Sequence, residues 1–196
     1  YFTFAERSSD PIPRVIFVGT LSYMANRQAA WRLVRDIMPL VRRQCPDARL
    51  LIVGQGPEPA LLAQHDGDQT VVTGRVEDVR PYLARAAVAC MPLSAGSGTK
   101  YKVLEALSAG VPTVCTPTAL EGLDLKDGEE LLVRETDEEL AAGVVTLIKQ
   151  SEVAARLARQ GREVVEHQYA WDANLPRLDA WLDQLLSLPL RREVNQ

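Results

Sequence analysis

A short run of small residues stands directly before a predicted helix, at residues 94–100 (SAGSGTK). Gly96 and Gly98 leave backbone N–H groups accessible, and the first turn of a helix adds unsatisfied N–H groups and the positive end of its dipole. Such a loop attracts anions, although its spacing is not that of a Walker A loop. The segment therefore predicts a phosphate or diphosphate site at Gly96, Gly98, Thr99 and Lys100, with added charge from the neighbouring Lys102. The alternative is an ordinary glycine-rich turn into a helix.

A carboxylate follows one to two turns into the same predicted helix. Glu105 sits among apolar neighbours, and its two oxygens can accept hydrogen bonds from adjacent hydroxyls such as those of a ribose. A surface ion pair with Lys102, three residues earlier on the helix, accounts for the same residue equally well. From the residues alone, both interpretations stay open.

Glycines also end several of the predicted strands. Gly19-Thr20 follows the first strand, and Gly74-Arg75-Val76 follows the third. Because glycine has no Cβ atom, a ligand can approach the backbone there, and Val76 could pack against a flat ring. The alternative at both positions is a simple turn at the end of a strand.

Two polar residues stand at the start of the first predicted helix. Asn26 is predicted to be its N-cap, and Arg27 to open it. From that position the Arg27 guanidinium could reach a phosphate, whereas a solvated surface charge is the commoner role of an arginine. Ser151 is predicted to cap a later helix in the way that Asn26 caps the first.

Short β-rich runs alternate with helical patterns along most of the chain. Strands are predicted at residues 15–19, 50–54, 70–74, 87–93, 111–116 and 131–134. Helices are predicted at residues 27–44, 58–64, 77–85, 99–109, 137–150, 152–168 and 171–186. This alternation indicates an α/β fold, a Rossmann-like, doubly wound parallel sheet of about six strands with helices on both faces. Ligands of such sheets bind beyond the carboxyl ends of the strands, where the candidate residues lie.

Composition limits the remaining possibilities. The 196 residues suit one domain, predicted at residues 14–187 between a linker at 1–13 and a flexible tail at 188–196. A net charge of −4 gives no basic field for nucleic acid. Cys45, Cys90 and Cys115 are too scattered for a zinc site, so we expect reduced thiols, no metal site and a cytoplasmic protein. No apolar run approaches the ~20 residues of a membrane span.

Four sequence blocks follow one another along the chain: FVGTLSYMANRQA, LLIVGQGPEP, VVTGRVEDVRPYLARAAVACMPLSAGSGTKYKVLEALSAGVPTVCTPTALEGL and YAWDANLPRLDAWL. In this order and spacing they resemble the C-terminal domain of the family-four GT-B glycosyltransferases, from residue 14 to about residue 186. The resemblance implies one half of a GT-B fold. It also implies binding of a UDP- or GDP-sugar as a substrate, with no separate cofactor, for retaining transfer of a hexosyl group.

The resemblance assigns roles to individual residues. Glu105 corresponds to the second Glu of the family's Glu-x(7)-Glu motif, which binds the ribose hydroxyls. The other implied contacts are the diphosphate with Gly98, Thr99 and Lys100, the base with Gly74, Arg75 and Val76, and the sugar and phosphates with Gly19 and Thr20.

The sequence departs from the family pattern at two places. Ser97 stands where the first Glu of the motif faces the donor sugar, and no Lys-Gly pair follows Arg27. A subgroup with GSGT-Lys in place of the first Glu is the closer match, with Lys100 supplying the charge for the phosphates. Lys100 and Ser97 are therefore the predicted catalytic positions. A module that binds a nucleotide sugar without turnover, or a degenerate domain, stays open as the alternative.

The resemblance also implies a partner domain. The acceptor would bind to an N-terminal domain, which this sequence is expected to lack, so this half alone is expected to be inactive in transfer. A lipid acceptor would bring the full-length enzyme to the inner membrane surface. An uncovered face between the two domains would favour self-association of this half.

Overall fold

The computed structural model describes residues 12–96, 98 and 100–187. Most of the predicted linker, the predicted tail at 188–196, and the predicted site residues Ser97 and Thr99 lie outside the described residues.

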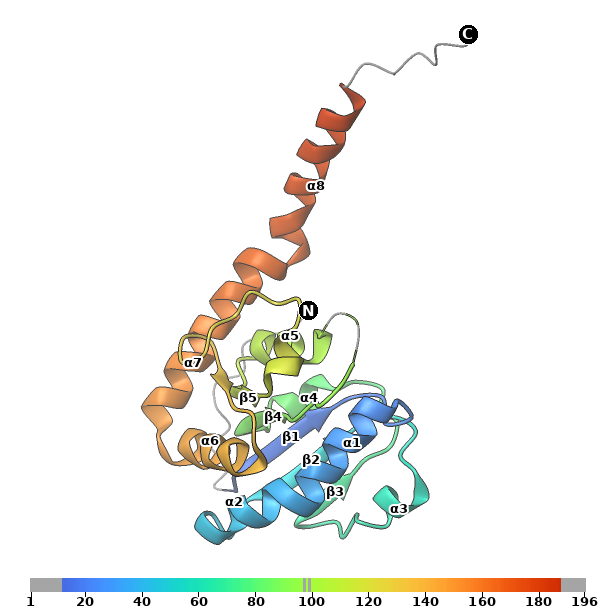
Figure 1. Cartoon of the computed structure of the whole chain (residues 1–196), viewed down its shortest axis with the longest axis vertical. Coiled ribbons are helices and arrows are strands. Elements are labelled where there is room, and N and C mark those ends of the chain that lie inside the picture. Colours follow the sequence, from blue (N-terminus) through green and yellow to red (C-terminus); the bar gives the residue numbers. More distant parts are fainter. Residues whose placement is uncertain (1–11, 97, 99, 188–196) are drawn as a thin grey trace.

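One parallel sheet forms the centre of the described chain (Figure 1). Its strand order is β3-β2-β1-β4-β5-β6, which confirms the predicted Rossmann-like, doubly wound sheet. The chain adds β2 and β3 on one side of β1, and β4, β5 and β6 on the other side. The topology therefore reverses between β1 and β4. The strands are β1 (Arg14–Val18), β2 (Arg49–Val53), β3 (Thr70–Val72), β4 (Val88–Met91), β5 (Thr113–Cys115) and β6 (Leu132–Val133).

The central strands are apolar on both faces because helices cover both sides of the sheet. Every residue of β4 and β5 is buried, and in β1 and β2 only the first residue is partly exposed. Phe17 and Ile52 pair across β1 and β2 and are fully buried. Cys90 and Cys115 lie in this core as free thiols. Such continuous apolar runs are typical of parallel strands between two helical layers.

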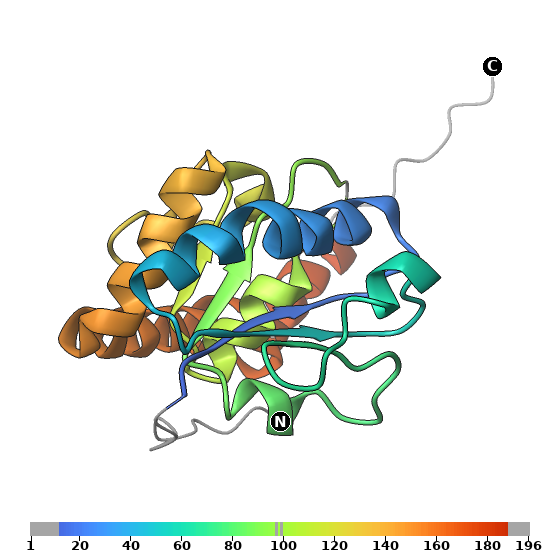
Figure 2. The ribbon, with the colours of Figure 1, turned by 90° about the horizontal axis from the view of Figure 1, so that it is seen from below.

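Helices pack on both faces of the sheet (Figure 2). The first layer contains α1 (Met24–Arg32), the π-helical turn Leu33–Ile37, α2 (Met38–Gln44) and α6 (Asp137–Lys149), which contacts α2. On the other face lie α4 (Arg80–Leu83) and α5 (Tyr101–Ser108). The remaining helical elements are α3 (Pro59–Leu62), the 3-10 turn Pro117–Leu120, α7 (Ser151–Val164), the π-helical turn Val165–Tyr169 and α8 (Trp171–Leu186).

Both predicted N-caps are wrong. Helix α1 begins at Met24 with Tyr23 as its N-cap, so Asn26 lies inside the helix. The Asn26 side chain, only 8% exposed, donates a hydrogen bond back to the Thr20 carbonyl oxygen at 2.9 Å instead. Gln150 is the N-cap of α7, and Ser151 is its first helical residue.

Helix α6 begins with a reciprocal capping box. The Thr136 hydroxyl accepts a hydrogen bond from the Glu139 N–H at 3.1 Å, and the Glu139 carboxylate accepts one from the Thr136 N–H at 3.1 Å. These bonds satisfy N–H groups that the first turn leaves without helical partners. They also lower the pKa of the Glu139 carboxyl, chiefly through the Thr136 N–H.

Replacing Thr136 by alanine is expected to lower the free energy of unfolding by about 1 kcal/mol, because the helix loses its N-cap hydrogen bond. Differential scanning calorimetry would measure the change. Thr146→Ala is the matched control in the same helix, because Thr146 bonds only to the carbonyl of its own preceding turn, at Ala142. An equal loss in both variants would show that the cap contributes nothing specific.

Helix α8 extends away from the rest of the described chain (Figure 1). It spans the predicted residues 171–186, and none of its residues is buried. Its apolar side chains are exposed, namely Trp171, Leu175, Leu178, Trp181, Leu182, Leu185 and Leu186.

Candidate functional site

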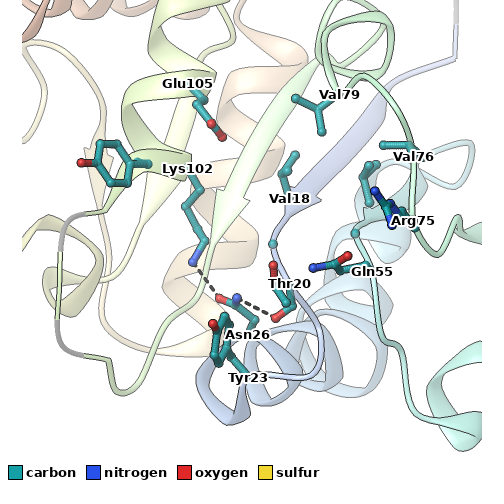
Figure 3. A pocket seen from close by; sticks show the side chains of 14 residues that line it. Val18, Thr20, Tyr23, Asn26, Gln55, Arg75, Val76, Val79, Lys102 and Glu105 are labelled. Atoms are coloured by element: carbon teal, nitrogen blue, oxygen red, sulfur yellow. Dashed lines mark hydrogen bonds between the residues drawn. The ribbon is translucent and has the colours of Figure 1, made fainter.

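A cleft of about 390 Å³ opens beyond the carboxyl ends of β1 and β2, between these strand ends and helix α5 (Figure 3). This is the edge where a doubly wound sheet binds its ligands. Its lining residues are Val18, Gly19, Thr20, Tyr23, Asn26, Val53, Gly54, Gln55, Arg75, Val76, Val79, Tyr101, Lys102 and Glu105.

Glycines bring the three strand ends together at this edge. The Gly19 N–H donates to the Val53 carbonyl oxygen at 3.0 Å, and the Gly54 N–H donates to the Gly74 carbonyl oxygen at 3.2 Å. A Cβ atom on Gly54 would lie 1.9 Å from the Gly19 oxygen, so no other residue fits there without movement of the backbone. Gly74 has a positive φ of +68° and open space where a Cβ atom would project. The floor of the cleft is therefore bare backbone.

Glu105 reaches the cleft from helix α5 (Figure 3). Among the described residues, no hydrogen bond or ion pair engages its carboxylate. Burial raises the pKa of the Glu105 carboxyl above its ordinary value, and the nearby Lys102 ammonium partly offsets this rise. The site thus holds a half-buried acceptor group that is open to donors from a ligand.

Lys102 enters the cleft from the same helix and bonds to a residue of α1. Its ammonium donates a hydrogen bond to the Asn26 side-chain oxygen at 2.7 Å, and the Asn26 amide nitrogen in turn donates to the Thr20 carbonyl oxygen (Figure 3). Burial lowers the pKa of Lys102, the neighbouring Lys100 lowers it further, and Glu105 opposes both effects.

The opposite wall comes from the segment after β3. Arg75, Val76 and Val79 face Glu105 across the cleft (Figure 3). Arg75 and Val76 also border a second hollow of about 510 Å³, which Thr73 and Tyr82 help to line. This wall offers two apolar side chains and one guanidinium to a ligand.

The structure brings five of the predicted site residues into the cleft, namely Gly19, Thr20, Arg75, Val76 and Glu105. A sixth, Gly74, lies beside it, because its carbonyl oxygen accepts the hydrogen bond from Gly54.

Four other predicted residues do not line this cleft. The Arg27 guanidinium points to Glu58, with 3.5 Å between Nε and Oε2. The Lys100 side chain is 5% exposed, and its ammonium bonds to the Gly96 carbonyl oxygen at 2.5 Å. It also lies 3.9 Å from a Glu121 carboxylate oxygen. Gly96 and Gly98 are exposed in the loop outside the cleft.

Nine of the 14 lining residues were not predicted as site residues: Val18, Tyr23, Asn26, Val53, Gly54, Gln55, Val79, Tyr101 and Lys102. Lys102 was predicted only to add charge beside the loop at residues 94–100. Its position three residues before Glu105, and thus on the same helix face, was a further signal for the cleft. Gln55 directly follows the second glycine-ended strand, at the edge where ligands bind. The cleft position of Asn26 had no sequence signal apart from its polarity.

Two acidic residues, Asp66 and Asp68, lie in the turn that precedes β3. This turn is at the end of the sheet opposite the cleft. The Asp66 carboxylate accepts hydrogen bonds from the N–H groups of Asp68 and Thr70, which lower its pKa. These bonds give the pair a role in shaping the turn.

Within the described part of the chain, no three His, Cys, Asp or Glu side chains gather as a metal-binding group would. No helix there has the length and apolar character needed to cross a membrane.

Comparison with known proteins agrees with this geometry. The profile of the family described as "Glycosyl transferases group 1" matches residues 12–150. The chain is 31% identical over 142 residues to the phosphatidyl-myo-inositol mannosyltransferase of Mycobacterium leprae, which covers 69% of this chain and 38% of that protein. It thus spans less than half the length of the curated relatives it matches.

Solved structures show the same fold at low sequence identity. The C-terminal domain of the group 1 glycosyl transferase LpcC from Francisella tularensis has a TM-score of 0.66 at 16% identity, covering 87% of this chain and 96% of that one. HepE of Anabaena, in complex with UDP-glucose, has a TM-score of 0.70 at 14% identity, covering 90% of this chain and 50% of that one. With a Rossmann-like sheet that forms one half of a GT-B fold, the chain belongs to the group 1 glycosyl transferases.

Proposed function

We propose that this domain binds a nucleoside diphosphate sugar, UDP- or GDP-linked, in the cleft beyond β1 and β2. The observation that carries the proposal is the half-buried Glu105 carboxylate, which faces the cleft without a hydrogen-bond or ion-pair partner among the described residues. Burying such a group is costly unless donors satisfy it. The two adjacent hydroxyls of a ribose would supply those donors.

The rest of the ligand follows from the placement of the ribose. The base would lie against Arg75 and Val76, where Gly74 leaves the backbone open. The diphosphate and sugar would extend over Gly19 and Thr20, since Gly19 keeps the strand end accessible. A ligand of this shape would cross the edge of the sheet at its topological switch point.

The proposed reaction is retaining transfer of a hexosyl group from this donor to an acceptor held by a further, N-terminal domain. The names of the relatives support it, because one is a mannosyltransferase and another is described with UDP-glucose. We expect this half alone to bind the donor without transfer, with Ser97 as the predicted position facing the sugar. A lipid acceptor, as in the name of the mycobacterial relative, would bring the full-length protein to the cytoplasmic face of a membrane.

Isothermal titration with UDP, GDP and ADP tests the proposal directly. Saturable binding of one nucleotide, and tighter binding of that nucleotide than of the other two, is the expected result. It would also identify the base. Failure of all three to bind would remove the donor site from this domain and leave only the fold.

Acidification is expected to weaken binding of the matching nucleoside, because protonation removes the charge of Glu105 and turns one of its two acceptor oxygens into an O–H donor. The raised pKa of this carboxyl places the loss at a higher pH than for an ordinary glutamate. Titrations from about pH 8 to about pH 5 would measure it. The nucleoside is the right probe, since it carries no phosphate that titrates in this range. Glu105→Gln should remove the dependence, and an unchanged pH profile in that variant would assign the effect to another group.

A further inference from the structure

Lys102 and Asn26 form a two-residue link across the cleft. The Lys102 ammonium bonds to the Asn26 side-chain oxygen at 2.7 Å, and the Asn26 amide bonds to the Thr20 carbonyl oxygen at 2.9 Å. The first residue belongs to α5 and the second to α1, so the link joins the two halves of the sheet. An ammonium has three N–H donors, and Asn26 uses one of them.

The surroundings of Lys102 favour an anion as its missing partner. Among the described residues, no carboxylate lies within ion-pair distance of its ammonium, although the side chain is half-buried. Burial lowers the pKa of Lys102, and an anion bound beside it would reverse that shift by favouring the charged form. Gly19 keeps the space beside this link open, because a Cβ atom there would lie 3.0 Å from the Asn26 amide.

Lys100, the cation that the sequence favours, is engaged elsewhere. Its ammonium bonds to the Gly96 carbonyl oxygen within its own loop and lies 3.9 Å from Glu121. Only 5% of its surface is exposed. It is absent from the cleft lining, whereas Lys102 is part of it. The Lys100 ammonium is thus directed to Gly96 and Glu121 and away from the cleft.

We infer that Lys102 is the cation that neutralises the diphosphate of the donor, and that Asn26 is the residue that positions it. The inference rests on the proposed function and names a residue of its diphosphate subsite. The family pattern has a Lys-Gly pair after the arginine at the position of Arg27, and this sequence lacks it. In the inference, Lys102 on α5 supplies the positive charge instead. Charge-assisted hydrogen bonds from a fixed ammonium are stronger than those from a mobile one, because less reorganisation accompanies binding.

The test compares the nucleoside diphosphate that binds with its phosphate-free nucleoside, by calorimetric titration and competition. Lys102→Gln is expected to weaken the diphosphate about 10- to 100-fold and to leave the nucleoside unchanged. Both are measured at about pH 8, because the loss of Lys102 also raises the pKa of Glu105 and would weaken the nucleoside at acidic pH. Lys102→Arg should retain most of the affinity. Asn26→Ala should weaken the diphosphate about 3- to 10-fold. Asn26→Asp should weaken it further than Asn26→Ala, because the new carboxylate pairs with Lys102 and repels the ligand.

Two controls separate this role from effects on folding and net charge. Lys100→Gln should leave the ratio of the two affinities unchanged even if it lowers the melting temperature. Lys149→Gln, at the exposed end of α6, removes one charge away from the cleft and should change neither affinity.

Three results would overturn the inference. An unchanged affinity ratio in Lys102→Gln, with normal nucleotide binding by the wild type, would refute it and leave the proposed function intact. If Lys100→Gln, and not Lys102→Gln, lost the higher affinity for the nucleoside diphosphate over the nucleoside, the diphosphate contact would belong to Lys100. A wild-type chain that binds no nucleotide would overturn both the inference and the proposed function.

Discussion

Glu105→Gln is expected to weaken nucleoside diphosphate binding about 10- to 100-fold, because a neutral amide replaces a charged acceptor of two ribose hydrogen bonds. Calorimetric titration measures the loss. The nucleoside and the diphosphate should lose the same factor, since both carry the ribose. This equal loss distinguishes Glu105 from Lys102, for which only the diphosphate is expected to lose affinity.

A ligand without ribose hydroxyls sharpens the test of Glu105. The 2′,3′-dideoxy form of the nucleotide should bind wild type and Glu105→Gln with similar affinity, because the interaction that the mutation removes is already absent. Glu138→Gln, on the exposed first turn of α6, is the matched control for the loss of one carboxylate. If Glu105→Gln weakened both ligands equally, the carboxylate would not be contacting the ribose.

The same substitution should raise the thermal stability of the unliganded protein. The raised pKa of Glu105 means that folding disfavours its ionised form, so its contribution to stability falls as pH rises through the folded-state pKa. At neutral pH glutamine removes this cost. A variant that is more stable yet binds less tightly is the signature of a residue kept for a ligand.

Gly54→Ala is expected to lower the free energy of unfolding by about 2–6 kcal/mol, from overpacking and backbone strain together. The new Cβ atom would lie 1.9 Å from the Gly19 carbonyl oxygen, and φ at Gly54 is +152°. Relief requires β1 and β2 to separate at the floor of the cleft, so nucleotide binding should fall as well. Calorimetry would measure the stability, and titration the binding.

Gly128→Ala is the matched control for Gly54→Ala. Its φ is +78°, and no heavy atom lies within 4 Å of the position of a Cβ atom. It therefore tests backbone conformation without a clash, with an expected loss of about 1 kcal/mol. Equal losses at the two positions would mean that the approach of Gly54 to Gly19 does not constrain the strand ends.

Periodicity and strand-end glycines were sufficient to predict the sheet. The runs that became β1, β2 and β4 are apolar on both faces, and only a covered parallel sheet buries such runs. These features are local, so a single sequence carries them. For Glu105 the residues alone left a ribose contact and a surface pair with Lys102 both open, and only the family resemblance favoured the ribose.

The direction of a lysine side chain could not be predicted in the same way. Lys100 and Lys102 stand two positions apart, and which one enters the cleft depends on where the helix begins. The structure places Lys100 at the N-cap of α5, where its ammonium reaches back to Gly96, and Lys102 in the first turn, facing Asn26. Asn26 was mistaken for a cap because local preference favours that role. Its side chain bonds instead to the Thr20 carbonyl oxygen, six positions away, and to the Lys102 ammonium, 76 positions away.

The projection of α8 bears on how this protein can be observed by optical methods. Two of the three tryptophans of the protein lie on α8, namely Trp171, which is 78% exposed, and Trp181, which is 56% exposed. Trp31 is the one held against the rest of the fold, where its indole N–H bonds to Glu58 and the Arg35 guanidinium lies over its ring. Indole emission shifts to shorter wavelength when water leaves the ring. Intrinsic fluorescence will therefore respond mainly to changes in the exposure of α8, and only weakly to the melting of the sheet.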